Sequence, residues 1–363
     1  MEALTHALRS VAAGALAVDT EGDSFHHYPE KVCLIQLSHG VTDLLIDPLA
    51  LDPAPLGPLL ADAGQRKILH GADYDLRVLH RDFAFEVRGL FDTMIAARLT
   101  GETAFGLAAL LERLLGVRAD KRFQRADWSL RPLTAEMREY AVTDTRHLAE
   151  LTARLEERLV ALGRIEWARE EFERLERVRW SAASDDPEAY RRIKRSGDLS
   201  RRELAVLREL VRSREELARA KDRPPFRVLA DEVLLELARR KPRGRGELQG
   251  VPRAPRGWPS GRVAETMLAA VQRGLELPEN ELPEQRRGER RRLDPEFEAR
   301  VKRLARHRDR VAEDLGLEPS LLAPKSVLIE LQRRLDEGRE PEGAEDLRRW
   351  QADQLLPGLS GPA

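Results

Sequence analysis

The sequence predicts a mixed α/β domain at the front of the chain, followed by two all-helical segments. Short apolar runs separated by turn residues fill the first 50 residues, helical patterns then alternate with short strands, and from about Leu148 the pattern is helical and highly charged. A length of 363 residues agrees with two or three domains, each able to bury its own core.

The front of the chain is predicted to hold a sheet flanked by helices. Residues 15–18, 32–37 and 44–46 are apolar runs with tight polar or Gly/Pro connections, a pattern typical of three strands in an antiparallel meander. After Pro48, helical patterns alternate with two further short strands at 67–69 and 89–91. This alternation indicates a mixed sheet covered by helices.

The rear of the chain is predicted to be helical throughout. A long amphipathic helix is expected from 151 to about 180, and Ser200 with Glu203 gives a capping-box start for another. Segments 181–198 and 278–295 are expected to be linkers, and 242–261 a basic connection rich in Pro, Gly and Arg. The predicted domains are 1–180, 199–280 and 290–358.

Charge is distributed unevenly along the chain. Residues 1–150 carry 16 basic and 22 acidic side chains, whereas residues 191–280 carry 22 basic and 13 acidic ones. This favours a carboxylate site followed by a module that binds a polyanion, although two ordinary solvated surfaces would look the same. The single cysteine, Cys33, excludes disulfides and all-cysteine zinc sites, and its apolar surroundings indicate a buried thiol. We expect a cytoplasmic protein, since neither a secretory signal nor a membrane span is evident.

The first candidate motif is Asp19 and Glu21. Alternate residues of a strand face the same way, so the two carboxylates project together beside Ala15 and Ala17, while Leu16 and Val18 face the core. Mg²⁺ and Mn²⁺ prefer carboxylate and water oxygens. Two solvated acids at the end of a strand are the alternative, and for this pair alone that alternative is the commoner case.

The second candidate motif runs from His70 to Leu76, between a strand and a helix. It contains two acids, Asp73 and Asp75. Asp73 suits a helix cap, and Asp75, within the first turn, suits a metal-facing carboxylate. The spacing by itself does not decide between them.

The third candidate motif is Tyr140 and Asp144, in a helix that begins near Thr134. Residues four apart lie on one face of a helix, one turn from each other. With a reference pKa near 10, a tyrosine is a poor base at neutral pH, so we expect it to orient a water while a metal acidifies that water. An ordinary helix with a half-buried tyrosine is the alternative.

Taken together, four acids and a tyrosine on a strand, a helix start and a helix predict a hydrolytic site with two divalent ions, Mg²⁺ or Mn²⁺. One ion would lower the pKa of the attacking water and the other would stabilise the departing 3′-oxygen. No protein nucleophile would be needed.

These motifs resemble those of the DEDD exonucleases of the tyrosine subclass. The stretch 17–21, continuing through 28–37, is similar to the first exonuclease motif, and 70–76 with 90–93 and 96–99 to the second. The stretch 126–133 followed by Tyr140 and Asp144 is similar to the third. The resemblance implies that Asp19, Glu21, Asp75 and Asp144 hold two ions and that Tyr140 orients the water, which favours Asp75 over Asp73.

The resemblance also implies the fold and the substrate. We expect a ribonuclease H-like exonuclease domain, with a mixed five-stranded sheet flanked by helices, followed by two small all-α bundles of the HRDC kind. Residues 204–241 are similar to the first HRDC copy and 296–336 to a second, divergent one. Such bundles are associated with nucleic-acid binding, so the expected partner is an RNA 3′ end, such as that of a tRNA precursor. A monomer and no membrane partner are expected.

Four further residues are candidates for contacts with substrate: Thr20, His70, Trp128 and Arg131. Trp128 and Arg131 could stack on or grip the terminal nucleotides. Packing for the tryptophan and an ion pair for the arginine are alternatives at least as good. For His70 a core or hydrogen-bonding role is favoured, and for Asp92 a helix cap or support for the site.

Two other functions compete with a 3′→5′ exoribonuclease. A single-stranded DNA 3′→5′ exonuclease could use the same metal chemistry, which does not read the sugar. A non-catalytic RNA-binding protein would lack one of the acids, and all four are present. Digestion of matched RNA and DNA separates the first rival, and release of mononucleotides separates the second.

Overall fold

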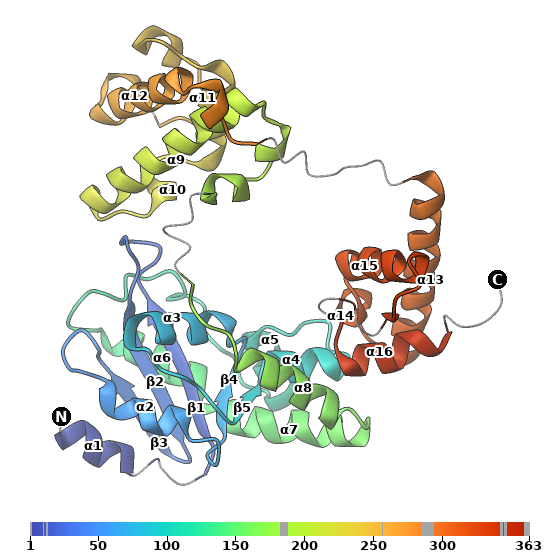
Figure 1. The fold of residues 1–363 in the computed structure, drawn as a ribbon. Coiled ribbons are helices and arrows are strands. Elements are labelled where there is room, and N and C mark those ends of the chain that lie inside the picture. The colour runs from blue at the N-terminus through green and yellow to red at the C-terminus, as the bar shows by residue number, and fades with distance from the viewer. Residues whose placement is uncertain are drawn as a thin grey trace. The chain divides into compact units, whose positions relative to one another are not determined.

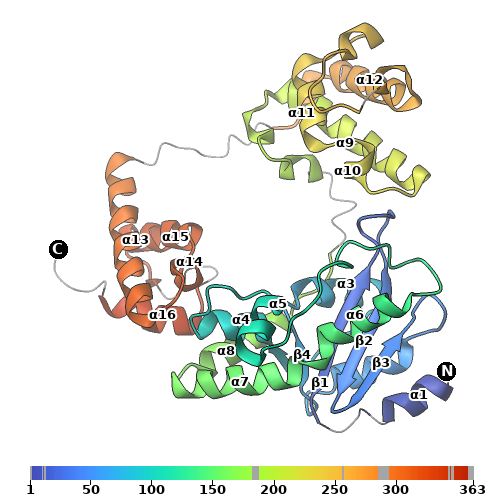
Figure 2. The ribbon, with the colours of Figure 1, turned by 180° about the vertical axis from the view of Figure 1, so that it is seen from behind.

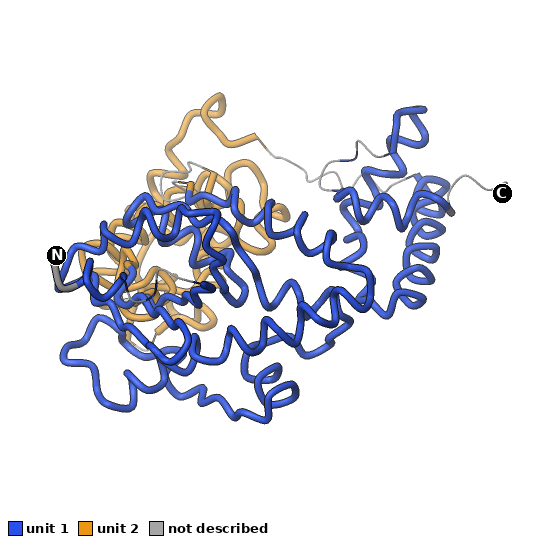
Figure 3. Tube along the Cα trace, turned by 90° about the horizontal axis from the view of Figure 1, so that it is seen from below, with its two compact units in different colours: residues 1–22, 32–180, 293–363 blue, residues 23–31, 181–292 orange. Residues whose placement is uncertain are grey.

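The computed structural model describes residues 2–9, 11, 14–181, 188–255, 257–284, 294–341, 344 and 347–358. These residues belong to two compact units (Figure 3). Unit 1 comprises residues 1–22, 32–180 and 293–363, and unit 2 comprises residues 23–31 and 181–292. The predicted linkers 181–198 and 278–295 lie partly outside the described residues.

Unit 1 is built on a mixed five-stranded sheet. Its strands are β1 (Leu16–Gly22), β2 (Val32–His39), β3 (Thr42–Ile46), β4 (Lys67–Leu69) and β5 (Leu90–Asp92). The strand order is β3-β2-β1-β4-β5, with β2 antiparallel to both β1 and β3, and with β4 and β5 joined in parallel to β1. The expected mixed sheet and meander are confirmed, and β1 lies at its centre.

Helices cover both faces of this sheet, as Figures 1 and 2 show from opposite sides. Those of the first 180 residues are α1 (Glu2–Arg9), α2 (Gly57–Ala61), α3 (Asp73–Phe83), α4 (Thr93–Leu99), α5 (Leu107–Leu110), α6 (Ala135–Arg146), α7 (Leu148–Ala161) and α8 (Ile165–Leu175), with a 3-10 turn at Ala54–Leu56 and a π turn at Leu111–Leu115. Leu16 and Val18 of β1 pack in one core with α3, while Ala17 packs in another with α4 and α7. Because both faces of the sheet are covered, every residue of β2 except His39 is buried.

The prediction of a single long helix over 151–180 is wrong. The chain forms α7 and α8 instead, and it turns between them at Gly163, whose φ of +68° is a left-handed conformation that glycine adopts without steric cost. The next residue, Arg164, is buried and donates hydrogen bonds to the backbone oxygens of Leu99 (2.7 Å) and Leu315 (2.5 Å). These bonds are long-range, so helical periodicity gives no sign of them.

The last helices of the chain complete unit 1. They are α13 (Pro295–Leu315), α14 (Pro319–Leu322), α15 (Lys325–Asp336) and α16 (Arg349–Leu355), with a final 3-10 turn at Leu356–Gly358. Their apolar side chains share one core with α4, α7 and α8. At this contact the rings of Trp167 and Trp350 stack at 4.9 Å, and Arg348 forms an ion pair with Glu171 at 3.0 Å.

Unit 2 is a helical bundle. Its helices are α9 (Arg201–Lys221), α10 (Pro225–Val228), α11 (Asp231–Arg240) and α12 (Arg262–Glu276), with 3-10 turns at Ala189–Arg192, Ser196–Asp198, Arg245–Leu248, Trp258–Ser260 and Glu279–Glu281. The predicted capping box of Ser200 and Glu203 begins α9. Helices α9 and α12 pack closely at Gly274, where an added Cβ would lie 2.5 Å from the Cα of Val206. No helix among the described residues is long and apolar enough to cross a membrane.

Unit 2 also includes residues 23–31, the connection between β1 and β2 in the sequence. His27 Nδ1 lies 2.6 Å from a carboxylate oxygen of Asp222, and the Tyr28 hydroxyl donates to Glu215. The Phe25 ring meets Phe226 of α10 edge to face, at 6.4 Å between centroids. This short connection is therefore packed on helices that lie almost 200 residues later in the sequence.

Candidate active site

The candidate site begins on β1, the central strand of the sheet. Asp19 and Glu21 lie two residues apart on it and are half-buried, and β1 is paired on both edges. The regular register with β2 ends between Glu21 and Gly22. The strand β4 pairs with β1 only at Leu16 and Ala17, so the backbone at Asp19 and Glu21 is fixed by its pairing with β2.

Helix α6 supplies the next two residues. Thr134 caps it by accepting a hydrogen bond from the Met137 amide, as its position predicts, and α6 packs against β1 and β2. Figure 2 shows α6 crossing this face of the sheet. Tyr140 and Asp144 are one turn apart, and the phenol donates a hydrogen bond to Asp144.

Three of the predicted metal ligands converge. Asp19, Glu21 and Asp144 each offer a carboxylate oxygen, and these oxygens all lie within 4.8 Å of one another. A single cation with oxygen ligands 2.0–2.6 Å away can touch all three. The cluster joins residues that are more than 120 positions apart in the sequence.

Asp75 lies beside this cluster but not within the group of three. It is in the first turn of α3, it is 7% exposed, and one of its oxygens accepts a 2.5 Å hydrogen bond from the Thr20 hydroxyl. Thr20 stands between Asp19 and Glu21 in the sequence, so one strand both supplies two acids and orients a third. The Thr20 hydroxyl therefore contacts the Asp75 carboxylate, whereas a contact with substrate was expected for Thr20.

Burial raises the pKa of all four carboxyls, and the charges of neighbouring acids raise those of Asp19 and Glu21 further. Burial is the first cause for Asp19, followed by the charges of Asp75, Glu21 and Asp144, and its pKa lies well above the usual range. The pKa of Glu21 is raised in the same way, while those of Asp75 and Asp144 rise to about 6, mainly through burial. Crowded acids that favour protonation are a sign of a site suited to positive charge.

The Tyr140 phenol is also held neutral. Burial raises its pKa first, and the charges of Asp144, Glu21 and Asp19 raise it further. A phenol that keeps its proton is a donor and cannot act as the base. Its ring is 8% exposed and packs against Trp128 and Phe123, with centroids 5.9 and 5.8 Å away, which fixes the direction of the hydroxyl.

The donor set fits a hard divalent cation. Its ligand atoms are all carboxylate oxygens, and no histidine or cysteine belongs to the group of three. Asp19, Glu21 and Asp144 are the residues that could hold such a cation, and Asp75 lies beside them. The oxygen ligands favour a hard divalent cation over softer metals.

Trp128 and Arg131 have structural contacts: packing for the tryptophan and an ion pair for the arginine, which were the alternatives to contacts with substrate. Trp128 is 1% exposed and is part of the support for Tyr140. Arg131 forms two hydrogen bonds to Asp47, at 2.6 and 2.8 Å, and donates to the backbone oxygens of Trp128 and Cys33 at 2.7 Å each. The guanidinium therefore ties the loop before α6 to β2 and to the residue that follows β3.

The remaining residues of the second motif support Asp75. Asp92 caps α4 by accepting from the Met94 and Ile95 amides, and its other oxygen accepts from the Ala72 amide at 2.7 Å, just before α3. His70 Nδ1 lies 2.9 Å from the Thr93 hydroxyl, which itself donates to the Leu69 oxygen, so the histidine has a hydrogen-bonding role between β4 and α4. Burial lowers the pKa of His70.

Asp73 is not the helix cap that its position suggested. It is the first residue of α3, no side chain caps that helix, and the Asp73 carboxylate pairs with Arg77 one turn on, at 2.8 Å. An exposed pair of this kind contributes little to stability. Of the two acids in the motif, only Asp75 faces the site.

A cavity of about 250 Å³ opens beside Tyr140 and Asp144. Two arginines that sequence reasoning missed, Arg118 and Arg122, line it together with Glu136, Glu139 and Thr143. Arg122 is paired with Asp120 at 2.5 Å, and Arg118 is 90% exposed. The four basic residues at 118, 121, 122 and 125, just before the third motif, are the sequence signal that could have marked this wall.

Comparisons with known proteins agree with this geometry. The 3′-5′ exonuclease family matches residues 1–160, and the HRDC domain family matches residues 203–270. Ribonuclease D of Jannaschia sp. (strain CCS1) is 32% identical over 346 residues, which are 93% of this chain and 88% of that protein. Ribonuclease D of Pseudomonas paraeruginosa is 33% identical over 346 residues, which are 94% of this chain and 89% of that protein.

A solved structure is similar over almost the whole chain. It is the crystal structure of Escherichia coli RNase D, an exoribonuclease involved in structured RNA processing. The TM-score is 0.77 at 30% sequence identity, and the match covers 99% of this chain and 95% of that one. The likeness therefore extends through the exonuclease sheet and the helices that follow it.

Proposed function

The chain belongs to the ribonuclease D family of 3′-5′ exonucleases, and we propose that the carboxylate cluster on β1, α3 and α6 is its catalytic site. It is a metal-dependent exoribonuclease. The single observation that carries the proposed site is the convergence of Asp19, Glu21 and Asp144 oxygens within 4.8 Å.

In this proposal the four acids hold two divalent ions, Mg²⁺ or Mn²⁺. When bound, these cations supply an acidified water and stabilise the charge of the departing 3′-oxygen. Asp19 and Glu21 present their oxygens from the rigid central strand, and Thr20 holds the Asp75 carboxylate in one orientation through its 2.5 Å hydrogen bond. The protein thus places the charges before substrate arrives, which avoids reorganisation during the reaction.

Tyr140 would orient the attacking water. Its phenol stays protonated because burial and the nearby carboxylates raise its pKa, so it cannot act as the base. Trp128 and Phe123 hold the ring, and Asp144 accepts from the hydroxyl. Because Asp144 receives the one hydroxyl proton, the phenol oxygen is left to accept a hydrogen bond from the water, and its fixed position beside the metal ligands directs that water.

The substrate that we propose is the 3′ end of RNA, in particular the trailing sequence of tRNA precursors or other structured RNA, with release of nucleoside 5′-monophosphates. The Escherichia coli relative is an exoribonuclease involved in structured RNA processing, which supports this proposal. The second HRDC-like bundle over 290–358, the cytoplasmic location and the monomeric state remain predictions.

Digestion of matched single-stranded RNA and DNA tests the proposed function. Both oligonucleotides carry one sequence and a 5′ label, and both are incubated with Mg²⁺ or with Mn²⁺. We expect single-nucleotide shortening of the RNA from its 3′ end and slower loss of the DNA. A clear preference for DNA would overturn the proposed substrate, and intact RNA at every metal concentration would overturn the proposed activity.

Asp19→Asn is the matched inactive variant. Because Asp19 is central to the cluster and distant in sequence from the basic helical segment, we expect this change to abolish cleavage and to leave RNA binding nearly unchanged. Glu157→Gln, at an exposed position of α7, is the control. Loss of binding equal to the loss of cleavage in the Asp19 variant would contradict separate catalytic and binding surfaces.

A further inference from the structure

Gln36 is a buried polar residue that does not belong to the set of predicted metal ligands. It lies on β2 and is 0% exposed, and among the described residues neither its amide nitrogen nor its amide oxygen has a hydrogen-bond partner. A buried amide with both groups unpaired costs stability, because each group has lost its hydrogen bonds to water. A residue of this kind calls for a function that outweighs that cost.

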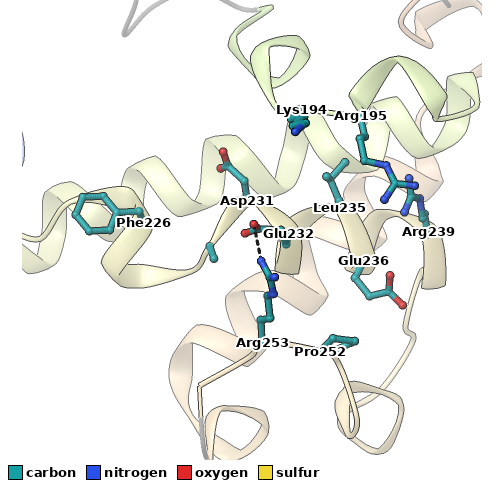
Figure 4. A pocket seen from close by; sticks show the side chains of 11 residues that line it. Lys194, Arg195, Phe226, Asp231, Glu232, Leu235, Glu236, Arg239, Pro252 and Arg253 are labelled. Atoms are coloured by element: carbon teal, nitrogen blue, oxygen red, sulfur yellow. Dashed lines mark hydrogen bonds and ion pairs between the residues drawn. The ribbon is translucent and has the colours of Figure 1, made fainter. Parts of the chain in front are cut away.

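Paired polar groups are the rule in proteins, and other parts of this chain follow it. At the groove of unit 2 that Figure 4 shows, the Glu232 carboxylate pairs with Arg253 at 2.8 Å. Another buried glutamine, Gln351, donates from its amide nitrogen to the Leu321 oxygen at 2.9 Å. Gln36 departs from this pattern at a position deep in the exonuclease sheet.

The register of the sheet places Gln36 directly opposite Asp19. Residues that lie directly opposite each other in an antiparallel pair have Cβ atoms about 4.5–5.5 Å apart, with both side chains on one face of the sheet. The same register places an apolar residue, Leu34, opposite Glu21. Of these two acids of β1, Asp19 is therefore the one with an amide beside it on the neighbouring strand.

The neighbours of Gln36 on β2 indicate which face of the sheet it lies on. Side chains alternate along a strand, so Leu34, Gln36 and Ser38 face the same way. Leu34 packs with Tyr140 in one apolar cluster, and Ser38 Oγ lies 2.6 Å from Thr145 Oγ1. Both partners are on α6. The Gln36 amide is therefore buried between β2 and α6, on the face that carries the carboxylate cluster.

The chemistry of a metal ligand explains what an amide can do at this position. An ionised carboxylate has only acceptor atoms, so hydrogen bonds to it must come from donors nearby. Carboxylates that bind metal ions are themselves hydrogen-bonded in proteins, and these bonds fix their orientation. Thr20 donates such a bond to Asp75. The amide N–H of Gln36 can do the same for Asp19.

We infer that Gln36 is a positioning residue of the metal site, and that its amide N–H donates to the Asp19 carboxylate when that carboxylate binds a cation. The inference rests on the proposed function, because it concerns the same carboxylate cluster. The amide breaks no other hydrogen bond of the protein when it turns toward Asp19, so the new bond adds directly to the affinity for the cation. Gln36 acts through Asp19 and contacts neither the RNA nor the attacking water.

Replacement of Gln36 by methionine separates this role from a structural one. Methionine is an unbranched, adaptable side chain without an amide, so the change removes the proposed donor and the two unpaired groups together. With EDTA present, we expect Gln36→Met to melt no lower than wild type, because no hydrogen bond is lost. Its affinity for Mn²⁺ should fall on the order of tenfold, as expected for loss of a partner behind a metal ligand. Lower melting in EDTA with unchanged Mn²⁺ affinity would show a structural role and overturn the inference.

Electron paramagnetic resonance of free Mn²⁺ measures the affinity of the full-length protein without RNA. Gln36→Asn keeps the amide on a side chain that is one methylene shorter, and it should retain more of the affinity than Gln36→Met. The reverse order would assign the effect to packing volume and contradict a role for the amide. Gln65→Met is the matched control: it changes a buried glutamine whose amide nitrogen donates to the Val11 oxygen at 2.8 Å, and it should leave the Mn²⁺ affinity unchanged.

Cleavage assays distinguish failure of this inference from failure of the proposed function. Gln36→Met should need about tenfold more Mn²⁺ for half-maximal cleavage and should reach the wild-type rate at saturating metal. If wild type binds Mn²⁺ and cleaves RNA while Gln36→Met binds Mn²⁺ equally tightly, the inference is overturned and the proposed function stands. If wild type neither binds Mn²⁺ nor cleaves RNA, the proposed function fails, and the inference fails with it.

Discussion

Replacement of Asp75 by asparagine tests whether the charges of the site destabilise the metal-free protein. Asp75 is 7% exposed, and its pKa is raised from 3.8 to about 6, chiefly by burial. A carboxyl with a raised pKa binds its proton more tightly in the folded protein than in the unfolded chain. Its contribution to the free energy of unfolding therefore falls as pH rises through the window from about 4 to about 6.

The magnitude follows from the shift. A difference of about two pKa units corresponds to about 3 kcal/mol above pH 6, since one unit is about 1.4 kcal/mol. Asparagine removes the charge and keeps an oxygen that can accept the hydrogen bond from Thr20. We therefore expect metal-free Asp75→Asn to be more stable than wild type at pH 8, by up to about 3 kcal/mol. The gain shrinks to about half at pH 5, where wild-type Asp75 is largely protonated when folded.

Differential scanning calorimetry in the presence of a chelator measures this effect. For a domain of this size, 1 kcal/mol shifts Tm by about 2–4 °C, so the expected rise at pH 8 is several degrees. Adding Mg²⁺ should raise Tm more for wild type than for the variant, because the cation binds the folded carboxylates. Glu157→Gln, an exposed change, should leave Tm unaltered. A Tm for Asp75→Asn at or below that of wild type at pH 8 would refute the argument.

Three further changes probe the support of the site. Thr20→Val removes the hydroxyl that holds Asp75 and should raise the Mg²⁺ concentration needed for half-maximal activity, whereas Thr20→Ser should keep that concentration at the wild-type value. Equal metal titrations for both variants would exclude a positioning role for the hydroxyl. Tyr140→Phe keeps the ring and removes the hydroxyl, so single-turnover cleavage should slow on the order of a hundredfold, while Mg²⁺ binding measured by calorimetry is retained. An unchanged cleavage rate would show that the phenol has no role in the reaction. Arg131→Lys loses the bidentate contact with Asp47 and should lower the free energy of unfolding by about 1–3 kcal/mol without changing RNA affinity. Loss of RNA affinity in a fully folded variant would indicate that Arg131 contacts the substrate.

The strands and the spacing of the acids could be predicted from the sequence because they depend on local rules. Alternation on β1 places Asp19 beside Glu21, and a four-residue interval on α6 places Tyr140 beside Asp144. Both rules concern neighbours in the chain. The order of the elements, with short connections at the front, also limits how the sheet can be arranged.

Contacts between distant residues could not be predicted in this way. The bonds from Arg131 to Asp47 and from Thr20 to Asp75 join residues 84 and 55 positions apart, and no periodicity marks them. The break at Gly163 was missed because an isolated glycine costs a helix only about 1 kcal/mol, and the buried Arg164 beside it forms long-range bonds. The packing of α13–α16 into the core of unit 1 has the same cause, since an amphipathic helix does not specify its partner.

The shared core of unit 1 has a consequence for synthesis of the chain on the ribosome. Trp167 on α8 has Trp350 on α16 as its stacking partner, and the residues of unit 2 are translated between them. At a translation rate of about 5–20 residues per second, the apolar side of α7 and α8 stays uncovered for roughly 10–35 s before α16 is synthesised. During that interval the nascent protein exposes an apolar surface. The interval is long enough for a chaperone to bind this surface and prevent aggregation.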